Sequence, residues 1–422
     1  MRRRDGAGRV SAPAAPDEPR VTRRAPDPGP VSVRRLVGGL TGRTPGGPLV
    51  FGDERALAFL GGLSRRLLRV GRPELTALGY FLRPARLRAG LAAAAPGPGR
   101  LRMPRGLVFQ VPPGNVPTLF GYSWAMALLA GNPSVVRLSS RSGPVAEALL
   151  REIGLALADA PPAVARTQSL VGYAPDPAVT RALSAACATR VLWGSDRTVA
   201  ALRAEPLPPD ARELVFGDRS SIALFSAAGW AAASERARTR AVEDFHADTY
   251  WYGQAACASP RTVLWVGSEP VATAGWRDFL ARLARLLDDR EPAVDTATAV
   301  ETRIASYGLA ATGDATRLRF HRPGLTSVRL AARRPPPRRW LGTGTFAHTR
   351  LARLDDLVPL LDRHTQTVTH FGFPPADLTG LAHRLGGRSF DRIVPMGAAL
   401  EFDTVWDGHD LLAEFSRLVT VR

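Results

Sequence analysis

The chain has 422 residues, of which 45% are hydrophobic, so it can bury a sizeable core as one large domain or a few smaller ones. No run of about 18 apolar residues occurs and no apolar segment follows the arginine-rich start, so we expect neither a membrane span nor a secretion signal. The formal net charge is +18. The only two cysteines, Cys187 and Cys257, lack metal-ligand or disulfide spacing, and we therefore expect a reduced, cytoplasmic protein without a bound metal.

The positive charge is concentrated in the first quarter of the chain. Residues 1–105 contain 21 arginines against 7 acidic residues, or +14 of the net +18. Such a region could bind an acidic carrier protein, phosphate groups or nucleic acid. It has no nucleic-acid-binding motif, so we do not expect nucleic acid. All 56 basic residues of the chain are arginine, a bias typical of GC-rich genomes, and a solvated surface explains many of them equally well.

The first two segments differ in composition. Residues 1–32 are rich in Pro, Ala, Gly and Arg, which predicts a disordered basic tail. Residues 33–105 are expected to form an N-terminal helical region, because leucines recur there at helical spacing, at Leu57, Leu60, Leu63, Leu67 and Leu68.

From Gly106 onwards, short apolar runs alternate with helical stretches. Strands are predicted at 106–112, 134–139, 167–173, 189–194 and 221–226, with helices at 117–129 and 144–157. After a helical stretch that begins near Ala227, further strands are predicted near 262–266, 327–330 and 366–370. This alternation predicts an α/β fold with two parallel-sheet domains in series.

Asn115 lies directly after the first of these strands, which ends in Pro112-Pro113-Gly114. Proline favours the first turn of a helix, and Val116-Pro117 follows, so Asn115 lies in the cap region of the next helix. Two interpretations are open. The side chain either caps that helix or offers its amide to a developing oxyanion.

Two more turns follow predicted strands, at the sheet edge where open α/β sheets bind ligands. The first turn carries four side chains that suit phosphate oxygens, those of Arg137, Ser139, Ser140 and Arg141. In the second, Gly194 and Ser195 open a helix whose N-terminus could face a phosphate. Neither turn is specific alone, because the chain is rich in arginine and strand–glycine–helix turns are common.

Cys257 lies between a helical stretch that ends near Gly253 and a strand that begins after Ser259-Pro260. A free cysteine is ordinarily a small buried apolar residue. A tight loop between a helix and a strand is, however, a common setting for a catalytic side chain. Cys257 is therefore the candidate nucleophile of the chain.

Taken in order, these segments resemble one family, the acyl-CoA reductases of the LuxC type, which belong to the aldehyde dehydrogenase superfamily. The matching stretches are GLVFQVPPGNVPTLFGYSWAMALLAGNPSVVRLSSR, VLWGSDRTVAALR, FGDRSSIALF, QAACASP and FDRIVPMGAALEFDTVWDGHDLLAEFSR. The resemblance implies an aldehyde dehydrogenase-like fold with two Rossmann-like domains. We place the cofactor-binding domain at 106–225, the catalytic domain at 226–398, and a C-terminal segment that packs back on the body at 399–422.

The resemblance also implies roles for individual residues. Cys257 matches the catalytic nucleophile, and Asn115 matches the asparagine whose amide joins the cysteine N–H in the oxyanion hole. The positions expected to bind the cofactor are Pro112, Arg137, Ser139, Ser140, Arg141, Gly194, Ser195 and Gly217. Relatives that prefer NAD often have an acidic residue after the position of Arg137. Because this chain has Ser139-Ser140-Arg141 there, we expect NADPH.

The chain departs from the superfamily where oxidising members have the glutamate that activates water. It reads Val215-Phe216-Gly217-Asp218-Arg219 there, and Glu213 lies two residues away. Without that base, an acyl-cysteine would be reduced rather than hydrolysed. We therefore expect an NADPH-dependent reductase that converts an acyl-CoA or carrier-protein thioester to an aldehyde through a cysteine acyl-enzyme.

Several alternatives stay open. The enzyme could release acyl chains only from carrier-protein thioesters in a biosynthetic pathway, or act as a hydrolytic aldehyde dehydrogenase. An acyl-transferring partner protein and a homo-oligomer, a dimer or tetramer, are also expected from the resemblance. The block Trp406 to Asp410 is typical of the family, and its simplest interpretation is a structural turn, although His409 and Asp410 could reach a site.

Overall fold

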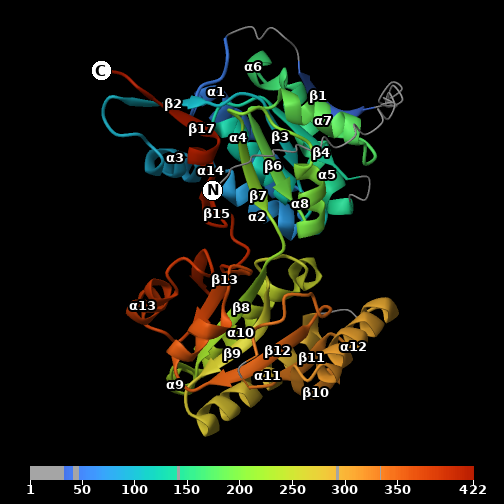
Figure 1. Cartoon of the computed structure of the whole chain (residues 1–422), viewed down its shortest axis with the longest axis vertical. Helices are drawn as coiled ribbons and strands as arrows, with labels where there is room; N and C mark the ends of the chain where they lie inside the picture. Colours follow the sequence, from blue (N-terminus) through green and yellow to red (C-terminus); the bar gives the residue numbers. More distant parts are fainter. Residues whose placement is uncertain (1–32, 41–46, 140–142, 291–293, 333) are drawn as a thin grey trace, which may run out of the picture. The chain divides into compact units, whose positions relative to one another are not determined.

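The computed structural model describes residues 33–40, 47–139, 143–290, 294–332 and 334–422, which belong to one compact unit. The predicted disordered tail, residues 1–32, lies outside the described residues. The chain folds around two mainly parallel sheets with helices (Figure 1). The predicted α/β fold class is thereby confirmed.

The first sheet has six strands in the order β1-β5-β4-β3-β6-β7, and only β1 runs antiparallel to its neighbour. Its strands are β1 (Arg34–Leu40), β3 (Val108–Val111), β4 (Ser134–Leu138), β5 (Thr167–Gly172), β6 (Thr189–Trp193) and β7 (Arg212–Phe216). The helices between them are α4 (Leu119–Leu129), α5 (Pro144–Ala158), α6 (Pro162–Ala165), α7 (Pro177–Ala186) and α8 (Asp196–Arg203).

Alternate residues of these strands enter two different cores. In β3, for example, Val108 packs in the core that contains α4 and α5, while Phe109 packs in the core that contains α7 and α8. Both faces of the sheet are therefore covered, which explains why β3 is buried throughout.

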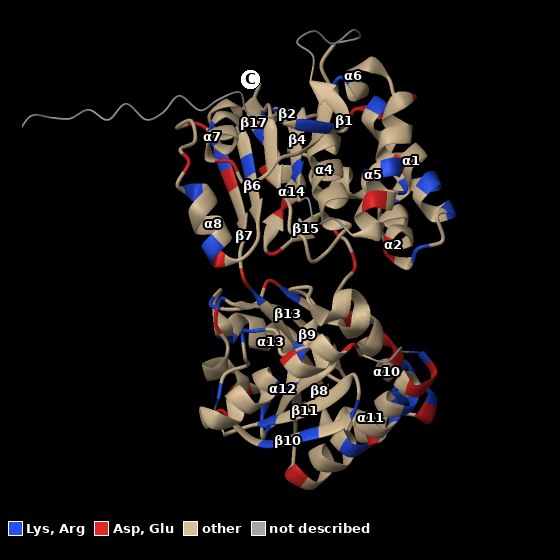
Figure 2. Ribbon diagram, turned by 90° about the vertical axis from the view of Figure 1, so that its right-hand side faces the viewer, with Lys and Arg blue, Asp and Glu red and all other residues tan. Residues whose placement is uncertain are grey.

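The N-terminal helices are α1 (Glu54–Arg69), α2 (Pro73–Phe81) and α3 (Pro84–Ala93). Asp53 caps α1 by accepting a hydrogen bond from the N–H of Arg55. The predicted apolar stripe is present, because Leu57, Leu60 and Leu63 are buried in the first core. The opposite face of α1 is basic (Figure 2), with Arg65 and Arg69 exposed and Arg66 half-buried.

The second sheet has seven strands in the order β10-β11-β12-β9-β8-β13-β14, with only β10 antiparallel. Its strands are β8 (Ser220–Ser226), β9 (Pro260–Val266), β10 (Ala315–Arg322), β11 (Leu325–Leu330), β12 (Thr345–Leu351), β13 (Thr365–Phe371) and β14 (Arg392–Pro395). The accompanying helices are α9 (Ala227–Ala232), α10 (Glu235–Tyr250), η1 (Trp251–Gln254), α11 (Glu269–Arg290), α12 (Thr296–Ala311), η2 (Leu354–Leu360) and α13 (Pro375–Leu385).

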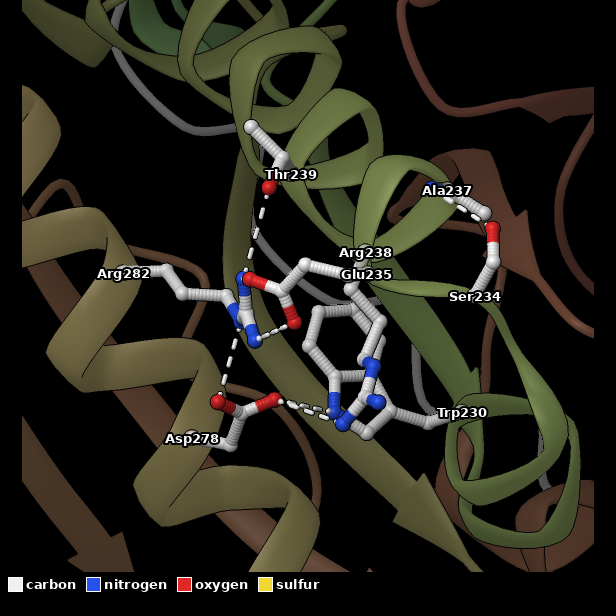
Figure 3. Close-up of polar contacts among 8 residues, drawn as sticks. All are labelled: Trp230, Ser234, Glu235, Ala237, Arg238, Thr239, Asp278 and Arg282. Atoms are coloured by element: carbon white, nitrogen blue, oxygen red, sulfur yellow. Dashed lines mark hydrogen bonds and ion pairs between the residues drawn. The ribbon is translucent and has the colours of Figure 1, made fainter.

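A polar network fastens α9, α10 and α11 to one another (Figure 3). Asp278 accepts hydrogen bonds from the indole of Trp230, at 3.0 Å, and from Arg282, at 2.9 Å. Arg282 also forms an ion pair with Glu235 at 2.6 Å, and Arg238 approaches Asp278 at 3.3 Å. This network holds α10, the helix that leads to Cys257, against α9 and α11.

The C-terminal residues return to the first sheet. They form β15 (Val405–Trp406), β16 (His409–Asp410), α14 (Leu411–Glu414) and β17 (Ser416–Thr420), and β17 pairs antiparallel with β2 (Arg100–Pro104). The ring of Phe402 stacks on Tyr122 of α4 at a centroid distance of 4.9 Å, and Trp406 packs on the same ring. This packing places Asp407 and its neighbours beside the first sheet.

The structure differs from the sequence-based expectation at four elements. The region 33–105 contains the strands β1 and β2 besides its helices. Helix α4 begins at Leu119, two residues later than expected. Strand β8 was expected in the first domain but pairs with β9 and β13, so the chain enters the second sheet at Ser220. The domain limits themselves remain a prediction. No helix in the described part of the chain is long and apolar enough to cross a membrane.

Candidate active site

A cavity of about 420 Å³ opens at the carboxyl ends of β3, β4, β6 and β7 and at the loop before β9. Eight predicted site residues line it, namely Pro112, Asn115, Arg137, Ser139, Gly194, Ser195, Gly217 and Cys257. The other two, Ser140 and Arg141, lie outside the described residues. Segments far apart in the sequence thus meet in one cavity.

Asn115 does not cap α4. The N-cap position belongs to Thr118, and the amide nitrogen Nδ2 of Asn115 instead donates a hydrogen bond of 2.8 Å to the carbonyl oxygen of Ala255. The cap interpretation is therefore wrong, and the side chain reaches the loop that carries Cys257. An amide nitrogen has two N–H groups, so one remains for a ligand.

The loop before Cys257 has an unusual backbone. Tyr252, Gly253 and Gln254 have φ of 55°, 58° and 59°, in the left-handed region that residues other than glycine rarely occupy. Two side chains of the second domain, Trp340 and Thr343, each donate to the carbonyl oxygen of Gly253 at 3.1 Å. Such strain persists only where surrounding contacts hold it.

Gln254 fixes the same loop from the other side. Its Nε2 donates to the carbonyl oxygen of Pro260 at 3.0 Å, and its Oε1 accepts from the N–H of Gly344 at 2.8 Å. Downstream, the carbonyl oxygen of Cys257 accepts a hydrogen bond of 2.7 Å from the hydroxyl of Ser221. The main chain around the thiol is therefore fixed on both sides.

The two cysteines have different environments. Cys187 is fully buried, its thiol donates to the carbonyl of Ser184 at 3.3 Å, and burial raises its pKa to about 11. Cys257 is only half-buried and lines the cavity. Burial raises the pKa of the Cys257 thiol, the negative charge of Asp407 raises it further, and the positive charge of Arg261 acts in the opposite direction.

The first sheet contributes a turn that suits a phosphate group. Ser195 is the N-cap of α8, where its hydroxyl accepts from the N–H of Thr198 at 3.3 Å. Gly194 has φ of 152°, and a Cβ on Gly217 would lie only 2.7 Å from Oδ1 of Asp196. A larger residue would therefore be strained at Gly194 and would clash with Asp196 at Gly217.

Arg137 has an unpaired donor. Its guanidinium lies 4.8 Å from the ring centroid of Tyr173, and its Nε is buried without a hydrogen-bond partner. A buried unsatisfied donor is costly, so a ligand oxygen at this position would be stabilised. Together with the helix N-terminus at Ser195, this feature fits a phosphate-bearing cofactor.

Aromatic side chains form much of the remaining wall. Trp193 and Phe216, opposite each other on β6 and β7, stack at a centroid distance of 3.6 Å with an interplanar angle of 9°. Phe402 and Trp406 of the C-terminal segment also line the cavity. These surfaces suit a planar ring or an aliphatic chain.

Among the described residues that line the cavity, the acidic ones are Asp218 and Asp407. Val215 is not part of the lining, and Glu213 forms ion pairs with Arg190 at 2.5 Å and Arg203 at 2.8 Å. Glu213 therefore does not replace the glutamate of the oxidising enzymes. The described residues also contain no group of three or more His, Cys, Asp or Glu that could hold a metal ion.

Sequence reasoning missed Asp407. It assigned the block Trp406–Asp410 to a structural turn, and the turn is real, because Asp407 has φ of 49° and Gly408 has φ of 77°. Asp407 nevertheless lines the cavity, and its Oδ1 accepts a hydrogen bond from Nε2 of Gln366 on β13. The sequence did offer one signal for Asp407: it is an acidic residue between Trp406 and Gly408, in a block that is typical of the family.

One family model matches the sequence. It describes the LuxC acyl-CoA reductases and covers residues 100–310. No curated protein matches the sequence.

Several solved structures share the fold at low sequence identity. An NADP-dependent enzyme of E. coli has 14% identity and a TM-score of 0.61, covering 88% of this chain and 85% of the other. An oxidoreductase of Marinobacter aquaeolei has 14% identity and a TM-score of 0.61, covering 90% and 87%. An aldehyde dehydrogenase of Brucella melitensis biovar abortus 2308 has 13% identity and a TM-score of 0.62, covering 87% and 85%. These similarities establish an aldehyde dehydrogenase-like fold.

Proposed function

Because the chain belongs to the LuxC family of acyl-CoA reductases, we propose that it reduces an acyl thioester to the aldehyde through a thioester on Cys257. The observation that carries this proposal is the meeting of Cys257 and Asn115 at one cavity whose described lining lacks a glutamate at the water-activating position. A nucleophile and an amide donor suffice for acyl transfer. The missing base favours reduction over hydrolysis.

In the first step the Cys257 thiolate attacks the carbonyl carbon of the substrate thioester. The attacking and departing sulfur atoms have similar basicity, so exchange is feasible in both directions. The free N–H of the Asn115 amide and the N–H of Cys257 stabilise the tetrahedral oxyanion. The fixed loop from Tyr252 to Gln254 keeps these donors in position before the substrate arrives.

The acyl group then stays on Cys257 as an electrophilic thioester. Trp193, Phe216 and Phe402 exclude water from it, and Glu213 is held away by its ion pairs. Hydrolysis is thereby slow. After reduction, the Cys257 thiolate leaves and the aldehyde is released.

The reductant fits the first-sheet side of the cavity. A bound nicotinamide cofactor would supply the hydride, and its phosphates would be held by Arg137, Ser195 and the main chain at Gly194 and Gly217, with Pro112 beside them. NADPH is the proposed form, because Ser139 and Arg141 replace an acidic residue that would repel a 2′-phosphate. The E. coli enzyme of similar fold is also described as NADP-dependent, which supports this choice.

The acyl donor is proposed to be CoA or an acyl carrier protein. The basic face of α1 supports the second possibility, since an acidic carrier would be attracted to it. We further propose a cytoplasmic homo-oligomer that can receive acyl groups from a transferring partner. The oligomer and the transferring partner rest on the family resemblance, and the cytoplasmic location rests on the two cysteines without disulfide spacing.

The test combines NADPH with acyl-CoAs of rising chain length, and follows both the loss of NADPH absorbance and trapped aldehyde. We expect aldehyde formation that Cys257→Ala abolishes. Cys187→Ala is the matched control and should retain turnover, because Cys187 is buried away from the cavity. Turnover that survives in Cys257→Ala would contradict the proposal.

A further inference from the structure

We propose that Asp407 is a catalytic residue that accepts the proton of the Cys257 thiol and returns it to the departing thiolate. This inference rests on the proposed function, since it assigns a proton carrier to the same acyl-transfer step. Val215 and Glu213 offer no base to the cavity, so the proton of the attacking thiol needs another acceptor.

Asp407 and Cys257 come from distant parts of the chain and line the same cavity. Asp407 lies in the tight turn between β15 and β16, and Gln366 of β13 holds its carboxylate by a hydrogen bond to Oδ1. The left-handed φ of 49° at Asp407 is a conformation that aspartate and asparagine tolerate better than most residues. Left-handed backbone at a residue that lines a cavity is a feature found at functional sites.

The charges around Asp407 leave its carboxylate available for protonation. Arg219 attracts it, but Arg219 is ion-paired with Asp391 and also donates to the carbonyl of Thr365. His409 is a weaker positive influence, and Asp391 is a repelling one. Burial is the largest influence, and it raises the pKa of Asp407 to about 6. A carboxyl group with such a pKa exchanges protons readily near neutral pH.

The charge of Asp407 acts on the Cys257 thiol. The negative charge of Asp407 raises the pKa of the thiol, so the ground state holds the proton on sulfur and the charge on the carboxylate. When Asp407 accepts that proton, its charge disappears and the thiolate is no longer repelled.

With Asp407 as the carrier, every proton of the catalytic cycle is accounted for. The thiol proton moves to Oδ of Asp407, the thiolate forms the C–S bond, and the substrate C–S bond breaks. The departing thiolate receives the proton from Asp407, which is again a carboxylate. After the hydride has been transferred and the aldehyde has left, the Cys257 thiolate takes one proton from solvent, in agreement with the one proton that the reduction consumes.

Asp218, the other acid of the lining, suits this role less well. It is exposed, and its carboxylate accepts the N–H of Asp196 at 3.2 Å while its own N–H donates to Asp196 at 3.0 Å. These bonds fasten the turn after β7 to the start of α8. Asp218 therefore has a structural function on the first-sheet side of the cavity.

The experiment compares the wild-type enzyme with Asp407→Asn, which keeps the size and tolerates the left-handed backbone. Asp403→Asn is the control: Asp403 is exposed in the same segment and its Oδ1 accepts the N–H of Thr404, a bond that asparagine can also make. Two readouts are measured against pH. One is kcat/KM with an acyl-CoA and NADPH, and the other is the rate of Cys257 alkylation by iodoacetamide.

We expect the two readouts to change in opposite directions in Asp407→Asn. The value of kcat/KM should fall about 100-fold, within the range of general acid–base catalysis, and lose its acidic inflection near pH 6. Alkylation should accelerate several-fold below pH 8, because the thiol loses a repelling charge. Asp403→Asn should match the wild type in both.

Three outcomes would overturn the inference. If Asp407→Asn keeps the wild-type kcat/KM, Asp407 does not carry the proton. If turnover and alkylation fall in parallel, Asp407 has a structural role. If the wild type reduces no acyl-CoA, the proposed function fails, but the alkylation rate still tests whether Asp407 acts on the Cys257 thiol. An alkylation profile against pH that is the same in Asp407→Asn and the wild type would overturn the inference.

Discussion

The Nδ2 of Asn115 donates a hydrogen bond of 2.8 Å to the carbonyl oxygen of Ala255, two residues before Cys257. This bond joins the first strand–helix turn of one sheet to the loop that carries the nucleophile. If the second N–H of the amide stabilises the oxyanion, Asn115→Ala should lower kcat about 100- to 1000-fold with little change in KM. Steady-state kinetics with an acyl-CoA tests this.

Asn115→Asp provides the sharper comparison, because it keeps the shape of the side chain and removes its N–H donors. Asn115→Asp should lose at least as much activity as Asn115→Ala, because its carboxylate also repels the oxyanion, and Cys257 should remain accessible to alkylation in both variants. An Asn115→Ala enzyme within threefold of the wild-type kcat would exclude the amide from the oxyanion hole.

The unpaired Nε of Arg137 predicts a contribution to cofactor binding. Arg137→Met keeps the aliphatic volume and removes the charge, and it should raise the Kd of NADPH about tenfold or more, as expected for a lost charge-assisted hydrogen bond. The quenching of tryptophan fluorescence reports binding, since Trp193 lines the cavity. Arg151→Met on α5, an exposed arginine away from the cavity, is the control.

Ser139 offers a separate test of the choice between NADPH and NADH. Ser139→Asp introduces the acidic group that NAD-preferring relatives have in this region. It should weaken NADPH binding more than NADH binding, because a carboxylate repels the 2′-phosphate. An equal effect on both cofactors would mean that Ser139 does not face the 2′ position.

The fold could be predicted from the sequence to a large extent, and the cavity only in part. Strands such as β3 and β6 were found because both of their faces are apolar. Strand β1, RRLVGGL, was missed because it is a partly exposed edge strand with two glycines. Asn115 and Cys257 were found by their turns, whereas Asp407 reaches the cavity only through the return of the C-terminal segment, a long-range contact without a local signal.

The left-handed backbone before Cys257 predicts a sensitive position at Gly253. Gly253→Ala would place a Cβ 3.2 Å from Oγ1 of Thr343 at φ of 58°. We expect the free energy of unfolding to fall by about 1–2 kcal/mol, from left-handed strain, and turnover to fall as well because the loop carries the nucleophile. Gly308→Ala within α12 is the control: it has no atom within 4 Å of its Cβ and should be neutral or stabilising. Thermal unfolding and kinetics of both variants test this.

The basic face of α1 predicts a difference between the two kinds of acyl donor. Arg65 and Arg69 are exposed, whereas Arg66 forms an ion pair with Glu152 at 3.0 Å and is best left intact. The double variant Arg65→Glu, Arg69→Glu should raise the KM for an acyl carrier protein and spare that for acyl-CoA. An equal loss on both substrates would argue against a carrier-binding surface there.

The central claim is that Cys257 carries the acyl group, and the mass of the intact protein tests it most directly. Incubation with an acyl-CoA in the absence of NADPH should add the mass of one acyl group to the wild type and release one equivalent of CoA. The adduct should map to Cys257, be absent from Cys257→Ala, and disappear with aldehyde release when NADPH is added. Aldehyde formation without an adduct on Cys257, or an adduct on another residue, would contradict the account.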